Sequence, residues 1–408
     1  MIYDSKDLYA QGVSCYKKTF TVPALGLDRL SILFEGVYMD NEIYLNGEKI
    51  FTWPYGYSQF EIDLTSYVKE GENTIWVKNT YELPNSRWYP GSGIYRNVWL
   101  VRRPAVHFTT DGGYLSAKKE GDAFILHADY EIQNDTDSAC EVTLCHTVLA
   151  PDGKVAGTSK ETLTIPCGLT VNKQTMTFEA PLLWDIESPN LYTVHSEIIK
   201  DETAIDSSDE RFGFRTIAFD PDKGFFLNGR NVKINGSCEH HTLGALGAAM
   251  NREAVRRQLT IMQKMGVNAI RSAHNMPAPE LMELCDEMGL LLYTESFDMW
   301  EHCKTDYDYG NYFKDWWKTD LTSWVRQDRN HPSVFIWGIG NEIHDIHFDR
   351  GLEVTKMLRD AVKELDYYGN AVIGMGSNIM GGEGAQKCAA EVDLVGYNYM
   401  EHLYDEHH

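Results

Sequence analysis

Long apolar segments and an excess of basic residues are both missing from this sequence of 408 residues. No stretch approaches the ~20 apolar residues of a membrane-spanning helix, so we expect no membrane partner. Lys and Arg total 37 against 60 Asp and Glu, a formal net charge of −23. A surface of that sign repels phosphate backbones, so nucleic acid is not an expected partner. Residues 1–11 lack the basic start and apolar core of a secretory signal, which favours a cytoplasmic location.

Closely spaced cysteines are lacking as well. The eight cysteines are scattered, with no Cys-x-x-Cys pair and no Cys-His cluster at zinc-ligand spacing. We therefore expect reduced, mostly buried thiols rather than a disulfide framework. With 43% hydrophobic and 24% charged residues, the composition is that of a folded globular chain. At roughly 150 residues per domain, the length predicts two to three domains.

The sequence divides into three zones. Residues 1–104 carry short alternating runs bounded by turn signals such as Asn46-Gly47, which is typical of a sandwich or jelly roll. Residues 105–218 carry polar alternating strands that fit one small two-sheet sandwich. Over residues 219–408, short apolar strands alternate with helical segments, which indicates a (β/α) barrel or a doubly wound sheet.

Six strands are expected in the third zone, whereas a closed barrel has eight. The expected strands span 232–236, 269–271, 290–294, 334–338, 371–375 and 392–397, and the expected helices span 251–265, 279–288, 313–328 and 352–365.

Polar and aromatic residues follow these strands directly, where barrel enzymes place their catalytic groups. The candidates are His240, His274, Glu295, Trp300, Asn341, Glu342 and Tyr399. His240 lies beside His241, and this pair fits a solvated loop as well as a site. Trp300 fits a core position as well as a flat platform for a sugar ring.

Glu342 is the strongest candidate. It follows an apolar strand and Asn341, whose amide can bond a hydroxyl. Burial at a barrel rim is expected to raise the pKa of such a carboxyl and to keep it protonated near neutrality. Glycosidic cleavage requires such a proton donor together with a second carboxylate. A purely structural role for Glu342 is the alternative.

Four segments of the chain resemble glycoside hydrolase family 2. They are 87–96, 266–275, 328–342 and 396–399. The resemblance implies a jelly-roll sugar-binding domain at 1–104 and an immunoglobulin-like β-sandwich at 105–218. An incomplete (β/α)8 TIM barrel, with about six of eight units, would follow at 219–408.

By this resemblance the chain belongs to a retaining glycosidase in which Glu342 is the general acid/base. The other implied roles are Asn341 on the sugar 2-hydroxyl, His274 on other sugar hydroxyls, Tyr399 orienting the nucleophile, Glu295 supporting the site and Arg87 reaching the substrate from a first-domain loop. The family nucleophile is a Glu on the seventh strand, and no residue here matches it. We expect a fragment of a longer enzyme, inactive by itself, whose nucleophile lies beyond His408.

Cofactor and substrate are read from the same resemblance. Some relatives hold magnesium through a Glu-x-His after the third strand, whereas Asp298-Met299-Trp300 stands there in this chain. The motif therefore supports no metal and no cofactor is expected, although the resemblance leaves a magnesium or sodium ion open. Segments 238–245 and 295–300 look most like the β-galactosidase branch, so a β-galactoside or related oligosaccharide is the expected substrate. A β-glucuronidase, a non-catalytic carbohydrate-binding fragment and a homo-oligomer stay open, whereas Gly340 before Asn341 argues against a mannosidase.

Overall fold

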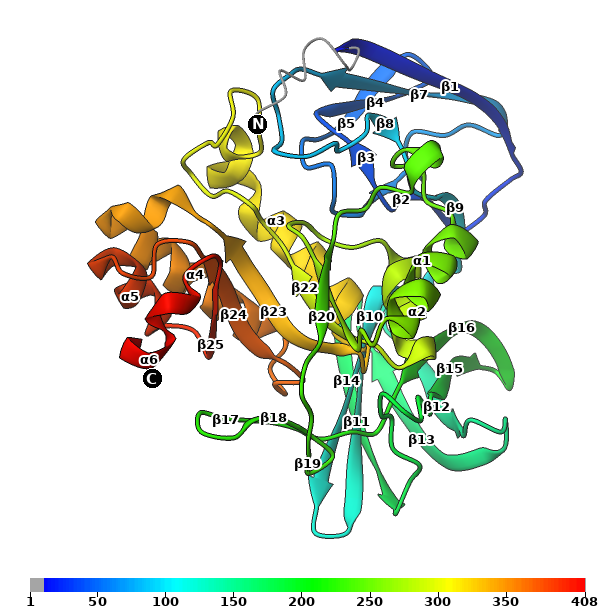
Figure 1. The fold of residues 1–408 in the computed structure, drawn as a ribbon. Coiled ribbons are helices and arrows are strands. Elements are labelled where there is room, and N and C mark those ends of the chain that lie inside the picture. Colours follow the sequence, from blue (N-terminus) through cyan, green and yellow to red (C-terminus); the bar gives the residue numbers. More distant parts are fainter. Residues whose placement is uncertain (1–10, 408) are drawn as a thin grey trace.

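The structure is a computed structural model that describes residues 11–407 (Figure 1). Residues 1–10, which carry nearly all of the segment examined for a secretory signal, and His408 lie outside the described part. Two antiparallel β-domains pack against a curled parallel sheet with helices on its outer side. The expected jelly roll, immunoglobulin-like sandwich and incomplete TIM barrel are confirmed.

The first domain is a sandwich of antiparallel strands. Its strands are β1 (Gly12–Val22), β2 (Arg29–Phe34), β3 (Val37–Tyr38), β4 (Asn41–Leu45), β5 (Glu48–Trp53), β6 (Phe60–Asp63), β7 (Gly71–Tyr81), β8 (Gly93–Ile94) and β9 (Val98–Arg103). The sheets run β1-β7-β4-β5, β6-β2-β9 and β3-β8. Asn46 has a φ of 53° in the turn between β4 and β5, so the predicted Asn-Gly hairpin is present.

The second domain is a two-sheet sandwich. Its strands are β10 (Val106–Glu120), β11 (Ala123–Asn134), β12 (Cys140–Leu149), β13 (Val155–Ile165), β14 (Gly168–Glu179), β15 (Tyr192–Lys200) and β16 (Thr203–Phe212). The sheets run β10-β11-β14 and β13-β12-β15-β16. Buried and partly exposed residues alternate along β15, because each sheet faces the core on one side only.

The third domain contains six parallel strands in chain order. They are β20 (Gly236–Glu239), β21 (Ala269–Ser272), β22 (Leu291–Glu295), β23 (Val334–Asn341), β24 (Val372–Ser377) and β25 (Leu394–Tyr397). Its helices are α1 (Arg252–Lys264), α2 (Pro279–Met288), α3 (Gly310–Asp328), α4 (Asp349–Leu365), α5 (Glu383–Ala389) and α6 (Tyr404–His407). Every residue of β23 is buried, since both faces of a parallel sheet are covered.

A small antiparallel sheet precedes the parallel one and corrects one sequence prediction. It consists of β17 (Ile217–Asp220), β18 (Gly224–Leu227) and β19 (Arg230–Asn231). The strand expected at 232–236 is wrong in its bounds, because Val232 donates its N–H to Phe225 in this sheet and packs beside Leu227. The first parallel strand begins only at Gly236.

The first domain is fastened to the third by side chains that cross the boundary. The Arg96 guanidinium donates to the carbonyls of Met276 at 2.8 Å and Pro277 at 3.1 Å, beyond β21. The Tyr55 hydroxyl donates to the carbonyl of Ser296 at 2.6 Å. Buried backbone oxygens thus receive partners from another domain, which fixes the first domain at one edge of the parallel sheet.

Two expectations about the whole chain can be compared with residues 11–407. All eight cysteines are free thiols, although only Cys285 and Cys388 are buried, so the expectation of mostly buried thiols is wrong. No helix in this described part has both the length and the apolar character that crossing a bilayer requires.

Candidate active site

Polar side chains from four parallel strands meet at one edge of the sheet. β21, β22, β23 and β25 all run in the same direction, so their carboxyl ends share one rim. Among the candidates, His274, Glu295, Asn341 and Glu342 belong to one hydrogen-bonded network rather than being separate solvated groups. A loop of the first domain, between β7 and β8, adds Arg87 to it.

Glu342 lies at the centre of this rim. It directly follows β23 with a φ of 48°, and its backbone N–H donates to the Gly376 carbonyl at 2.8 Å. Asn398 Nδ2 donates to Glu342 Oε1 at 3.0 Å, and Arg87 Nη1 donates to Oε2 at 2.8 Å. The Glu342 side chain is 10% exposed, so the carboxylate is both oriented and accessible to a ligand.

Asp298 holds the basic groups of the rim. Arg87 reaches it twice, through Nε at 2.9 Å and Nη2 at 2.5 Å. Lys304 Nζ donates to Asp298 Oδ1 at 3.0 Å and to the Asn341 carbonyl at 2.8 Å. Asn341 Nδ2 donates to the same carboxylate at 2.9 Å. With a side chain 1% exposed, Asp298 is a buried anion that positions its neighbours.

Glu295 supports the opposite side of the network. Its carboxylate is 0% exposed and accepts from Arg271 Nε at 2.5 Å and from His274 Nδ1 at 2.6 Å. Arg271 Nη2 also donates to Asn341 Oδ1 at 2.8 Å. A Cβ on Gly376 would lie 2.7 Å from Arg271 Nη2, so only glycine leaves room for this arginine. Within residues 11–407, Nε2 of His274 has no hydrogen-bond partner. The His274 side chain is 15% exposed.

The charges of the rim correct the expected pKa of Glu342. Burial alone would raise the pKa of this carboxyl, but hydrogen bonds from Asn398 and Arg87 lower it below its ordinary value. Burial likewise acts to raise the pKa of Asp298, and the charges of Lys304 and Arg87 lower it overall. The sequence could not show that a first-domain arginine contacts Glu342.

Three family models match consecutive parts of the chain. The sugar binding domain of glycosyl hydrolases family 2 matches residues 3–104, the central model of that family matches 114–215, and its TIM barrel domain matches 221–404. The chain belongs to glycoside hydrolase family 2.

Named members of family 2 are similar over most of this chain. A β-galactosidase of Bacteroides ovatus is 42% identical over 337 residues, 81% of this chain and 40% of its own length. A crystal structure of a family 2 member from Bacteroides cellulosilyticus superposes with a TM-score of 0.94 at 34% identity, covering 97% of this chain and 51% of that one. The crystal structure of a β-glycosidase from Bacteroides vulgatus superposes with a TM-score of 0.86 at 35% identity, covering 95% of this chain and 48% of that one. The chain thus spans about half the length of such relatives.

Two of the predicted family 2 site residues border the network without joining it through side-chain hydrogen bonds. His240 follows β20 and stacks on Trp88, with ring centroids 4.9 Å apart, and its ring lies 5.8 Å from that of His274. Burial and the neighbouring His274 lower the pKa of His240. Tyr399 follows β25 with a φ of 60° and 82% of its surface exposed.

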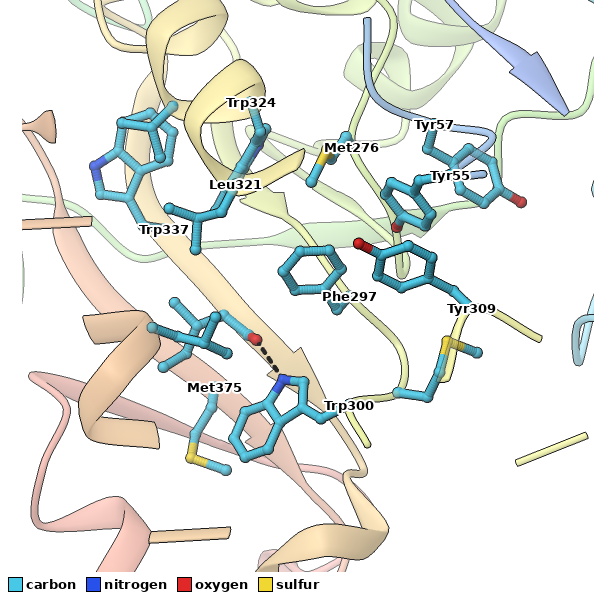
Figure 2. Close-up of a cluster of buried hydrophobic side chains, with 14 of the residues drawn as sticks. Tyr55, Tyr57, Met276, Phe297, Trp300, Tyr309, Leu321, Trp324, Trp337 and Met375 are labelled. Atoms are coloured by element: carbon cyan, nitrogen blue, oxygen red, sulfur yellow. Dashed lines mark hydrogen bonds between the residues drawn. The ribbon is translucent and has the colours of Figure 1, made fainter. Parts of the chain in front are cut away.

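Trp300 is a correction. Its ring is 0% exposed, and its Nε1 donates to the Ile339 carbonyl at 2.9 Å, so it offers no face to a sugar (Figure 2). It belongs to a buried cluster with Phe297 and Met375. Apolar residues after a strand pack into the core whenever the chain turns inward, and sequence alone does not show the direction of that turn.

Sequence reasoning missed several members of the site. These are Trp88, Arg271, Asp298, Lys304 and Asn398. Trp88, Arg271 and Asn398 stood inside the segments that carried the family resemblance, and Asp298 lies three residues after β22, so position along the chain was a usable signal. Lys304 lies in the segment after β22, and nothing in its local sequence distinguishes it from a surface lysine. Its side chain is only 3% exposed.

Metal binding finds no support in the geometry. Within residues 11–407, no group of three or more His, Cys, Asp or Glu side chains is arranged to hold a metal ion. Around Glu342 the carboxylates accept from Arg87, Arg271 and Lys304.

Proposed function

We propose that this chain is the substrate-binding and acid/base part of a retaining glycosidase that removes terminal β-D-galactosyl residues. The observation that carries the proposal is Glu342: an oriented, partly exposed carboxylate at the end of β23, beside Asn341, in a chain of family 2. Its position matches the demand of glycosidic cleavage for a proton donor at a barrel rim.

The proposed reaction has two displacements. Glu342 gives its proton to the glycosidic oxygen while a second carboxylate attacks the anomeric carbon, so the C–O bond to the leaving group breaks and a glycosyl ester forms. Glu342 then takes a proton from water, whose oxygen displaces the ester and restores the second carboxylate. The chain spans 40% of the β-galactosidase from Bacteroides ovatus, and we propose that the second carboxylate lies outside these 408 residues.

A relative's structure supports covalent catalysis. A β-glucuronidase of Bacteroides uniformis, 27% identical with a TM-score of 0.85, is described as covalently bound to cyclophellitol-6-carboxylate aziridine. Asp298, which Arg87 joins to Glu342, has both oxygens occupied by donors and is nearly inaccessible. It suits a positioning role better than nucleophilic attack.

Glu342 must be protonated to act as an acid, yet its pKa is lowered in the described chain. A second carboxylate close to Glu342 would raise that pKa, since two like charges disfavour joint ionisation. A sugar that draws Arg87 to its own hydroxyls would act in the same direction. The proposed acid therefore depends on groups that complete the site.

The sugar ring has candidate contacts on this chain. His274 can use its Nε2 on a hydroxyl, because Nδ1 is held by Glu295. Trp88 takes the platform role first assigned to Trp300: it is partly exposed and packs against both His240 and His274. Asn341, on the 2-hydroxyl, and Tyr399, toward the nucleophile, keep the roles that the family resemblance implies.

A galactoside is preferred over a glucuronide on the charges of the rim. A glucuronate carboxylate needs a cation, and within residues 11–407 the rim cations Arg87, Arg271 and Lys304 are already paired with carboxylates. The 42% identical β-galactosidase agrees with this choice. The rival is a β-glucuronidase, since a putative one from Formosa agariphila is 36% identical.

The deciding experiment compares kcat/KM of the longer protein containing this chain on p-nitrophenyl β-D-galactoside and β-D-glucuronide. Faster galactoside hydrolysis supports the proposal, and faster glucuronide hydrolysis overturns the substrate assignment. The same assay on the 408-residue chain alone tests whether it binds without turnover. Hydrolysis by the short chain at a comparable rate would show that its nucleophile lies within the chain, with Glu401 and Glu295 as the first residues to mutate.

A further inference from the structure

A cavity of ≈ 180 Å³ lies between the second domain and the amino-terminal end of the parallel sheet. Its walls come from β10, from residues 212–217, and from the loops that precede β23 and β24. Those loops lie at the opposite end of the strands from Glu342. The volume far exceeds the ~10–15 Å³ that one water needs, so the cavity, here called the base pocket, can hold a larger ligand.

The base pocket is lined by cations and by no acid. Its basic lining residues are Lys118, Lys119, Arg215, Arg329 and His331, and the described lining contains neither Asp nor Glu. Among residues 11–407, only His331 of these five forms an ion pair, with Asp286. A cavity lined by five basic residues and by no acidic one is unexpected in a chain with a net charge of −23.

Arg215 carries the argument further. Its Nη2 donates to the carbonyls of Val334 and Asn370, whereas its Nη1 is buried and has no hydrogen-bond partner among residues 11–407. A buried charged donor that lacks a partner costs free energy, so such a group points to a ligand that the protein alone does not supply. Burial lowers the pKa of Arg215 to about 10 and also lowers the pKa of Lys118.

Within residues 11–407 the nearest carboxylates form no ion pair with Arg215 or Lys118. Asp286 accepts from His331 at 2.6 Å and from the N–H of Ser333 at 3.0 Å. Asp366 accepts from the Tyr114 hydroxyl and from Trp337 Nε1 at 2.9 Å. Both act on Arg215 only through space. Arg329, 6% exposed, likewise donates only to carbonyls, and its Nε has no partner.

We propose that the base pocket binds a small tetrahedral oxyanion, with inorganic phosphate as the ligand, and that the anion fastens the second domain to the parallel sheet. A rotation of the Arg215 guanidinium would bring Nη1 to the anion, and Lys118 would turn to it from its 3.2 Å contact with the Gly369 carbonyl. Lys118 and Arg215 come from the second domain and its exit segment, whereas Arg329, which also lines the cavity, comes from the barrel. One anion therefore contacts both sides.

The test measures binding rather than catalysis, so it stands apart from the proposed glycosidase activity. Thermal unfolding and calorimetric titration are run on the purified protein in sodium phosphate and in sodium chloride of equal ionic strength. Phosphate is expected to raise the unfolding midpoint and to bind with a measurable Kd. Lys118→Gln is expected to raise the Kd for phosphate about fivefold, because one charge-assisted contact is lost.

Lys160→Gln is the matched control, because Lys160 is an exposed lysine of the same domain on β13. It should leave the phosphate Kd unchanged. Arg215→Gln should abolish the phosphate effect, and Lys118→Gln provides the readout if that variant fails to fold. Glycerol phosphate identifies the source: tighter binding than phosphate favours an organic ester in the same pocket. No stabilisation beyond chloride, or equal phosphate binding by Lys118→Gln and Lys160→Gln, overturns the proposal.

Discussion

The two ends of the parallel sheet treat charge in opposite ways. At the carboxyl ends, Arg87, Arg271 and Lys304 each contact a carboxylate, and Glu342 remains partly exposed among them. At the amino ends, Arg215 and Arg329 donate to backbone carbonyls and have no acidic partner within residues 11–407. Both ends recruit basic side chains from β-domains, yet only the first is balanced.

This difference separates positioning from binding. Balanced charges lower the cost of burial and hold each other in fixed geometry, as a catalytic rim requires. Unbalanced cations stay costly until a ligand brings the missing charge. The rim is thus prepared for a proton transfer by one carboxyl, whereas the base pocket is prepared to bind an anion. Four variants sharpen the comparison.

The largest effect is expected for Glu342→Gln in the longer enzyme. Loss of general acid catalysis should lower kcat/KM by about 10²- to 10⁴-fold for poor leaving groups, and less for activated aryl glycosides that need little protonation. The measurement is kcat/KM across a series of aryl β-galactosides. Glu353→Gln, whose side chain is 67% exposed, is the control. Equal losses for all leaving groups would remove Glu342 from the acid role.

Next is Glu295→Ala, which leaves Arg271 and His274 without their carboxylate. Breaking a buried ion pair by removing one partner should lower the free energy of unfolding by about 3–5 kcal/mol. Urea denaturation measures it. Glu383→Ala removes an ion pair on α5 whose carboxylate is 83% exposed, and it should cost far less than Glu295→Ala because solvent screens the pair. Similar losses in both variants would contradict the balanced rim.

A smaller loss of stability is expected for Tyr114→Phe, near the base pocket. Tyr114 is 1% exposed, and its hydroxyl donates to the buried carboxylate of Asp366. Removing a hydrogen bond to a charged group should lower the free energy of unfolding by about 1.5–3 kcal/mol. Tyr67→Phe, at a tyrosine 41% exposed, should change it by less than about 0.5 kcal/mol. If the two substitutions cost the same, Asp366 is not held by Tyr114.

The smallest effect is a shift in titration for Arg87→Gln. Because hydrogen bonds from Asn398 and Arg87 lower the folded pKa of Glu342, this group stabilises the fold above its ordinary pKa of 4.5. That stability is lost as pH falls through the folded pKa. Arg87→Gln should raise the pKa of Glu342 and move the loss to higher pH.

Carbon NMR of labelled Glu side chains measures the Arg87→Gln shift, with the Glu342 signal assigned by its absence in Glu342→Gln. Arg102→Gln is the control, since its ion pair with Asp28 is exposed and lies in the first domain. An unchanged or lower pKa in Arg87→Gln would show that Asn398 alone determines the titration of Glu342.

Local patterns predicted much of this fold. The helix expected at 279–288 is α2 with the same bounds, because Pro279 can begin a helix and Gly289 adopts a φ of 70° after its last turn. The strand expected at 334–338 is extended in the structure to Asn341. The error at 232–236 arose because Val232 bonds to the small sheet of β17–β19 and the first parallel strand begins only at Gly236, which the local pattern does not reveal.

The candidate site was predictable only in part. Strand ends and family segments pointed to Glu295, His274, Asn341 and Glu342, which the structure joins in one network. The same reasoning overrated Trp300 and missed Lys304, because both outcomes depend on the direction in which a loop turns after β22. Side-chain direction in a loop is fixed by long-range packing, not by local propensity.

By itself the sequence determined the three zones, the parallel β/α pattern and the identity of the residues at each strand end, since hydrophobic period and turn chemistry act over a few neighbours. Only the tertiary structure decided which of these groups are charged partners. Arg87 lies 255 positions from Glu342, and the pair lowers a pKa that burial alone would raise. Within residues 11–407 Arg215 forms no ion pair, because the packing of two domains places Asp286 and Asp366 outside the cavity lining, from where they act on Arg215 only through space. Electrostatic balance depends on distance in space, which the order of residues along the chain does not record.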